Sequence, residues 1–162
     1  MKVSIKKLNG RNQLTCHRND GSVVAANLGP SLPHHDLAHF VAETRLGLRN
    51  GFYDNIANGY SVAELSDPEV IRSLGAETWM AEITARALQS LSSGACQPEQ
   101  FDELINTELA KFSFPPLANL NSQVAVELLA EFQDIVARFD ALAEGEVIEL
   151  HYCSAAAADT QP

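Results

Sequence analysis

Histidines and carboxylates crowd into one short segment of the chain. Three of the five histidines, His34, His35 and His39, lie within six residues together with Asp36, and Glu43 follows four residues after His39. Imidazole nitrogens and carboxylate oxygens are ligands of divalent transition metals, and histidine also exchanges protons near neutral pH. This segment is therefore the strongest candidate for a functional site.

Helical spacing gathers most of these side chains on one face. Taking His35 as zero and turning by about 100° per residue, His39 falls at about 40° and Glu43 at about 80°. Asp36 falls at about 100°, and His34 points elsewhere. The opposite side, between about 140° and 240°, is apolar and holds Leu37, Phe40, Val41 and Leu48.

Metal binding is one interpretation of the polar face. His35 and His39, four residues apart, can chelate a single divalent cation such as zinc. Adding Glu43 to the same ion is harder, because about 12 Å of helix rise separates it from His35. The predicted ligands are thus His35 with His39, or His39 with Glu43, and a further ligand from another element. The candidates for that further ligand include His17, His151, Glu77 and Glu82.

The predicted chemistry is hydrolytic, with a hydroxide formed on the bound cation as the nucleophile. A second interpretation is acid-base chemistry without metal, in which Glu43 or Asp36 acts as the catalytic carboxylate that orients His39. The segment is not H-E-x-x-H, so it is no zincin motif.

The simplest interpretation has no chemistry at all. A helix face opposite an apolar stripe normally lies in water, where Asp36 and Glu43 would support His39 through i,i+3 and i,i+4 contacts. The protein would then be a non-catalytic interaction or regulatory module, whose acidic helical surface meets a protein partner. Enzyme and binding module both remain open, and so does the identity of any protein or small-molecule partner.

The same segment resembles a motif of known proteins. Residues 32–43 read LPHHDLAHFVAE, Asp20-Gly21-Ser22 precedes them, and residues 145–150 read GEVIEL. This is similar to a group of small uncharacterised bacterial proteins with a D-G-S turn and the motif P-H-D-L-x-H-F-x-x-E. His35 matches the first histidine of the motif, and the additional His34 is a departure from it. The resemblance implies a bacterial cytoplasmic protein and implies no activity.

Composition narrows the class of protein. The chain has 162 residues, with 46% hydrophobic and 20% charged residues, which suits a single soluble globular domain. Its formal charge of −10 argues against a nucleic-acid partner. No stretch approaches the about 20 apolar residues that span a membrane. Three scattered cysteines without a C-x-x-C pair suit a reducing cytoplasm.

The elements that must position the site follow an α+β pattern. Alternation predicts strands over residues 1–8, 13–18 and 22–28, joined by turns at Asn9-Gly10 and at residues 19–21. Another alternating strand is expected over 146–152. The expected fold is a small antiparallel sheet, an N-terminal three-stranded meander plus the C-terminal strand, packed with about four helices on one face.

Helices are expected between these strands. They cover 33 to 46 or 48, 66–91 with a capping box formed by Ser66 and Glu69, a shorter helix from Pro98, and 121–142. Residues 51–61 are expected to form a structured loop with a helical turn over 53–57. The aromatic residues of this loop either fill the core or line the rim of a ligand site. The single domain is expected over 1–153, with a flexible tail over 154–162.

Overall fold

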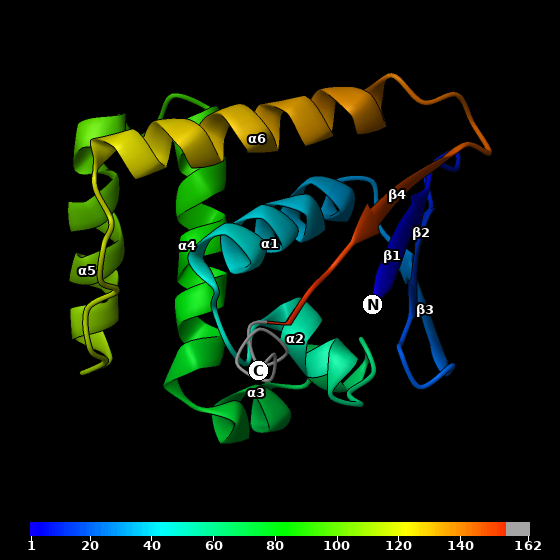
Figure 1. The fold of residues 1–162 in the computed structure, drawn as a ribbon, viewed down its shortest axis with the longest axis horizontal. Coiled ribbons are helices and arrows are strands. Elements are labelled where there is room, and N and C mark those ends of the chain that lie inside the picture. The colour runs from blue at the N-terminus through cyan, green and yellow to red at the C-terminus, as the bar shows by residue number, and fades with distance from the viewer. Residues whose placement is uncertain (155–162) are drawn as a thin grey trace, which may run out of the picture.

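The computed structural model describes residues 1–154, and within them four strands form one antiparallel sheet. The strands are β1 (Lys2–Lys6), β2 (Asn12–His17), β3 (Val23–Leu28) and β4 (Val147–His151), in the order β3-β2-β1-β4. β1 pairs with β2 on one side and with β4 on the other (Figure 1). The predicted α+β fold, with a meander completed by the C-terminal strand, is confirmed.

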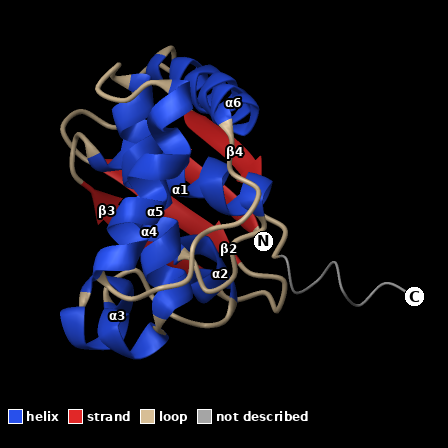
Figure 2. Ribbon diagram, turned by 90° about the vertical axis from the view of Figure 1, so that its left-hand side faces the viewer, coloured by secondary structure: helices blue, strands red, loops and turns tan. Residues whose placement is uncertain are grey.

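One face of the sheet carries the core. Inward residues of β1 and β2, such as Val3, Ile5 and Leu14, are fully buried, as is Cys16. Their chain neighbours on the other face are more exposed, which is the period-2 pattern of a sheet covered on one side. Figure 2 shows the helices in front of the strands, on that covered face.

Six α-helices and two 3₁₀ helices lie in residues 1–154, where the sequence predicts about four helices. They are α1 (Leu32–Leu46), α2 (Phe52–Ala57), η1 (Glu64–Ser66), α3 (Pro68–Leu74), α4 (Ala76–Ser92), η2 (Pro98–Gln100), α5 (Phe101–Lys111) and α6 (Ser122–Asp140). The helical turn expected over 53–57 is present as α2.

The helix predicted over 66–91 is wrong as a single element. Gly75, with φ +84° and ψ −167°, separates α3 from α4 in a conformation that favours glycine. The predicted capping box is also wrong, because the N-cap of α3 is Asp67, whose side chain accepts a hydrogen bond from Glu69 N. Ser66 Oγ instead donates to the carbonyl of Val62.

Helix α1 is the central helix of the fold. It packs against α2, α4 and α6, and it lies between α4 and the sheet (Figure 1). Every residue from Asp36 to Glu43 is buried. The interpretation that its polar face lies in water is therefore wrong: α2 and α4 cover the side that a helical wheel leaves to solvent.

Further findings concern the sheet, the tail and membranes. β1 lies between β2 and β4, so His17 and His151, two of the suggested further ligands, lie on strands that are not neighbours. The predicted tail lies outside the described residues except for Ser154, whose Oγ donates to Asp54 Oδ1 at 2.5 Å. Among the described residues, no helix has the length and apolar character needed to cross a membrane.

Candidate metal centre

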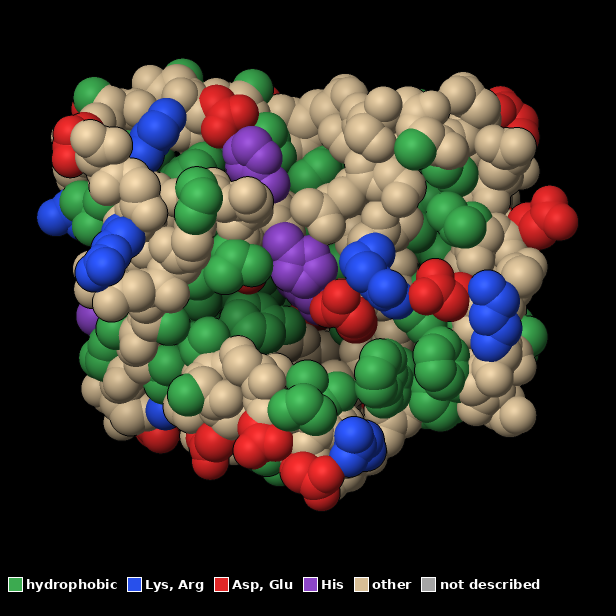
Figure 3. Space-filling model, turned by 180° about the vertical axis from the view of Figure 1, so that it is seen from behind, with side chains coloured by type: hydrophobic (Ala, Val, Ile, Leu, Met, Phe, Trp, Pro, Cys, Tyr) green, Lys and Arg blue, Asp and Glu red, His purple; other side chains and the backbone are tan. Residues whose placement is uncertain are grey.

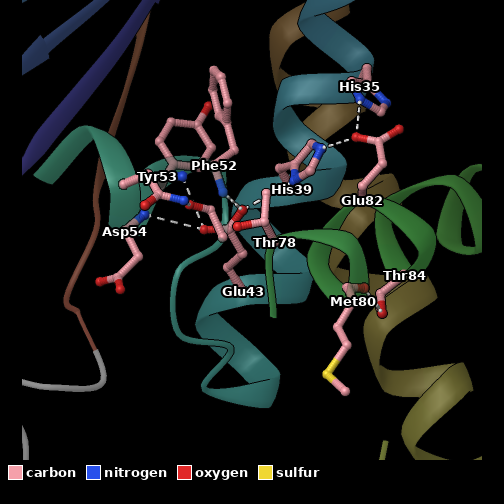
Figure 4. A network of polar contacts seen from close by, with 12 residues as sticks. His35, His39, Glu43, Phe52, Tyr53, Asp54, Thr78, Met80, Glu82 and Thr84 are labelled. Carbon is pink, nitrogen blue, oxygen red and sulfur yellow. Dashed lines mark hydrogen bonds and ion pairs between the residues drawn. The ribbon is translucent and has the colours of Figure 1, made fainter. Parts of the chain in front are cut away.

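The interface between α1 and α4 brings two histidines to one carboxylate. Glu82 Oε2 lies 3.0 Å from His39 Nε2 and 3.4 Å from His35 Nε2. The two imidazole rings are perpendicular, with centroids 4.7 Å apart. One ligand atom from each of His35, His39 and Glu82 lies within 4.8 Å of the others (Figure 4). Three side chains thus converge on one small volume.

His35 and His39 each form a hydrogen bond through Nδ1, the ring nitrogen that does not face Glu82. His39 Nδ1 lies 3.0 Å from Glu43 Oε1, and His35 Nδ1 lies 2.9 Å from Gln89 Oε1. An ionised carboxylate and an amide oxygen only accept hydrogen bonds, so each Nδ1 carries the proton. Each Nε2 is consequently the atom that faces Glu82.

Glu43 connects the histidine to α2. Besides the His39 contact, its carboxylate accepts hydrogen bonds from the backbone amides of Phe52 (2.7 Å) and Tyr53 (3.0 Å), with Asp54 N at 3.4 Å (Figure 4). These amides form the first turn of α2, where unpaired N–H groups favour an anion. Glu43 is completely buried by these partners and does not face the space between His35 and Glu82.

Gly51 makes this arrangement possible. A Cβ atom at residue 51 would lie 2.3 Å from Glu43 Cδ and 2.6 Å from Glu43 Oε2. Any other residue would displace the carboxylate, since real Cβ atoms do not approach this closely. Helix α4 holds the loop that contains Gly51, because Thr78 Oγ1 of α4 donates to the carbonyl of Asn50 at 2.7 Å.

The electrostatics of the cluster are strongly perturbed. Burial alone would lower the pKa of His39, but the hydrogen bonds with Glu43 and Glu82 outweigh it and raise the pKa to about 9. For Glu82, burial raises the pKa, and the hydrogen bonds from His35 and His39 reverse this and hold it well below its usual value. Without a metal, a proton on His39 Nε2 thus bridges the imidazole and the Glu82 carboxylate.

Asp36 lies close to the cluster without joining it. Its residue is 5% exposed, and its Oδ2 has no hydrogen-bond partner among residues 1–154. Burial raises the pKa of Asp36 to about 6, and the nearby His39 and His35 partly oppose this shift. A buried carboxylate oxygen without a donor is costly and rare in folded proteins, so it marks a place where a partner is missing.

A pocket of about 390 Å³ opens beside the cluster. Its polar lining consists of His35, Asp36, His39, Asn55, Ser66, Thr78 and Glu82. Its apolar lining consists of Leu28, Leu32, Phe52, Val62, Leu65, Ile71 and Trp79. Figure 3 shows apolar side chains around a hollow bordered by histidine and acidic side chains. The converging ligand atoms therefore lie next to a space that a small molecule can enter.

The structure sorts the predicted site residues. His35 and His39 come together, and of the four suggested further ligands only Glu82 joins them; Glu77 instead contacts Asn50 Nδ2. Glu43, predicted as a ligand, lies on the other side of the His39 ring. The sequence prediction missed Gln89, although it lies two helical turns after Glu82 on α4 and so shares a face with it.

Comparison with protein-family models, with curated proteins and with solved structures finds no match to this chain. The resemblance to the bacterial P-H-D-L-x-H-F-x-x-E group stays a prediction.

Proposed function

We propose that this protein binds a divalent transition metal ion, such as zinc, through His35, His39 and Glu82. The observation that carries the proposal is that both Nε2 atoms face one oxygen of Glu82 while both Nδ1 atoms are held by acceptors. Histidine ligands of metals typically donate their other N–H to a carboxylate or carbonyl in this way, which fixes the ring and leaves a lone pair for the ion.

The distances support the same conclusion. Two ligands about 2.0–2.1 Å from a tetrahedral zinc ion lie about 3.4 Å from one another. The two Nε2–Oε2 distances, 3.0 and 3.4 Å, are close to this value. A cation would therefore replace the bridging proton with small movements of three side chains.

The position of the cluster favours a reactive over a structural metal. Structural zinc ions are enclosed by four protein ligands, whereas three ligands next to a cavity leave a position for water or substrate. Two imidazoles and one carboxylate suit zinc, manganese or iron(II) better than calcium or magnesium. Hydrolysis by a metal-bound hydroxide is the reaction class we infer, with Asp36 as the further carboxylate that lines the pocket and Glu43 as a positioning residue behind His39.

Placement in the cytoplasm belongs to the proposal as well. Cys16, Cys96 and Cys153 are all free, and Cys153 is exposed. An exposed free thiol suits a reducing compartment.

Calorimetric titration of tag-free protein with zinc at pH 8 tests the metal site. We expect one site per chain, weakened more than about 100-fold by His39→Ala and by Glu82→Ala. His34→Ala is the matched control, because His34 is the neighbour of His35 on α1 but pairs with Asp140 at the surface. Zinc affinity of this variant should equal that of the wild type.

Absence of binding would overturn the proposal. If zinc, nickel and cobalt neither release heat nor raise the melting temperature, the cluster is a charge-paired structural feature. The interaction module without metal then becomes the preferred function.

A further inference from the structure

The pocket beside the candidate metal centre is built for an apolar body. Leu32, Phe52, Ile71 and Trp79 belong to its wall, and its volume of about 390 Å³ is that of a small-molecule site. Aromatic stacking supports one part of this wall. Trp79 stacks on Phe112, with ring centroids 5.5 Å apart, and Phe112 stacks on Phe114 at 5.8 Å. The indole therefore has an aromatic partner in the ligand-free protein.

The charges of the pocket select against anions. Asp36 and Glu82 both line it, and none of the lining residues, all in the described part of the chain, is lysine or arginine. Arg86 approaches Glu82 through the other carboxylate oxygen, Oε1, at 3.4 Å, and contacts Glu108 as well. A phosphate or carboxylate group would find no lysine or arginine on the wall, and the one cationic side chain there, His39, is already paired with Glu43 and Glu82.

Asp36 supplies a hydrogen-bond acceptor that would orient a ligand in the pocket. The side chain is almost fully buried and lines the pocket, and its Oδ2 accepts no hydrogen bond from residues 1–154. Because this oxygen is itself covered, the Asp36 side chain must turn slightly toward the pocket for a ligand N–H group to reach it, and burial makes such a hydrogen bond strong. The ligand should therefore carry an N–H donor and an apolar body, and no anionic group.

We propose that the pocket binds small uncharged carboxamides, with the N–H donated to Asp36, the apolar body against Trp79 and the carbonyl oxygen directed to the metal. An amide carries a donor and a good metal-binding oxygen on the same carbon, and it has no net charge. The contact with the metal rests on the proposed function, whereas the contacts with Asp36 and Trp79 do not depend on it.

Trp79 is the one tryptophan of the chain, so its fluorescence reports directly on the pocket. The probes are phenylacetamide and its anionic counterpart phenylacetate, titrated at pH 8 into metal-free protein. We expect a saturable change in Trp79 emission with the amide, and at least about tenfold weaker binding of the carboxylate, as expected for one lost hydrogen bond to a charged group. Zinc loading should then strengthen amide binding.

The Asp36→Asn variant tests whether Asp36 recognises the amide through a hydrogen bond or only packs against it. This variant keeps the shape of the side chain but gains a donor, so it should bind the amide about tenfold more weakly and lose the preference over phenylacetate. The circular dichroism spectrum of the metal-free variant, which should match that of the wild type, shows that the variant is folded.

The outcomes are distinct from those of the metal proposal. Equal affinity of the two probes for metal-free wild-type protein, or an unchanged preference in Asp36→Asn, overturns the assignment of Asp36. Amide binding that zinc does not strengthen overturns the contact with the metal. Failure of zinc binding itself appears in the calorimetry and leaves the metal-free comparison fully decisive.

Discussion

Two histidines of α1 pair with carboxylates at almost the same distance and in very different surroundings, one with Asp140 of α6 and one with Glu43 of α1. His34 Nε2 lies 2.9 Å from Asp140 Oδ1, and His39 Nδ1 lies 3.0 Å from Glu43 Oε1. The side chains of the first pair are 43% and 53% exposed, and those of the second are 6% and 0% exposed. Distance alone therefore does not distinguish a surface ion pair from part of a functional site.

His34 and His39 differ in the second group that each one contacts. His39 also faces Glu82, which lies next to His35 and the pocket, whereas the His34 ring lies perpendicular to the Phe139 ring. Burial then decides the energetics, since a surface ion pair contributes about 0–1 kcal/mol and breaking a buried one costs about 3–5 kcal/mol.

The largest difference should appear when each carboxylate is removed. Glu43→Ala leaves His39 Nδ1 and three backbone amides of α2 without an acceptor, and we expect the free energy of unfolding to fall by about 3–5 kcal/mol. Asp140→Ala should change it by less than about 1 kcal/mol. Urea denaturation of metal-free protein measures both, and equal losses would show that burial does not distinguish the two pairs.

Gly51 offers a way to disturb the buried pair without changing its charges. In Gly51→Ala the new Cβ would overlap the Glu43 carboxylate, and we expect a loss of about 1–3 kcal/mol in the free energy of unfolding. Gly29→Ala is the control, because nothing lies within 4 Å of a Cβ at Gly29. A Gly51→Ala protein as stable as its control would mean that Glu43 moves aside freely.

Between about pH 7 and 9, the pH dependence of stability should come mainly from His39. Its pKa is raised by its partners from 6.5 to about 9, so folding takes up a proton, and this stabilisation is complete below about pH 6.5. It is lost as the pH rises through 9, by about 1–2 kcal/mol between pH 7 and 8.5. His39→Gln should lack this loss, and His34→Gln should retain it.

The same experiment with saturating zinc tests whether His39 binds the metal. Because the metal binds the deprotonated imidazole, the loss of stability with rising pH should disappear in zinc-loaded protein. Denaturation curves at pH 7 and 8.5 with and without zinc make this comparison, and an unchanged slope would argue against His39 as a ligand.

The smallest effect should come from Gln89, which holds His35 on its outer side. Gln89→Leu should weaken zinc binding about tenfold, the lower end of the range for residues that orient a metal ligand. Calorimetry checks it against His34→Ala. Full zinc affinity in Gln89→Leu would mean that His35 is oriented by packing alone.

Much of the fold follows from local sequence patterns. Alternation in β1, β2 and β4 predicts the strands and their inward faces, because a period of two places apolar side chains on one side. The break between α3 and α4 does not follow in the same way. A glycine inside a helical pattern is often tolerated, and only the packing of the two segments shows that Gly75 turns the chain.

The candidate site divides along similar lines. The helical wheel places His35 and His39 on one face, because that relation is local. The selection of Glu82 over Glu77 depends on how α4 crosses α1, which is a contact across more than 40 residues. The amides of Phe52 and Tyr53 that bind Glu43 belong to the backbone, and no side-chain motif marks them.

The position of β4 has a consequence for how the chain folds. β1 is flanked by β2 and β4, and Lys2 pairs with His151 across nearly the whole sequence. During synthesis, one edge of β1 stays open until residues 147–151 have left the ribosome, and open edges invite intermolecular pairing. By contrast, all side chains of the candidate metal centre, residues 35–89, are synthesised long before. The helices of the site can pack together on the nascent chain, and closure of the sheet is the late and aggregation-sensitive step.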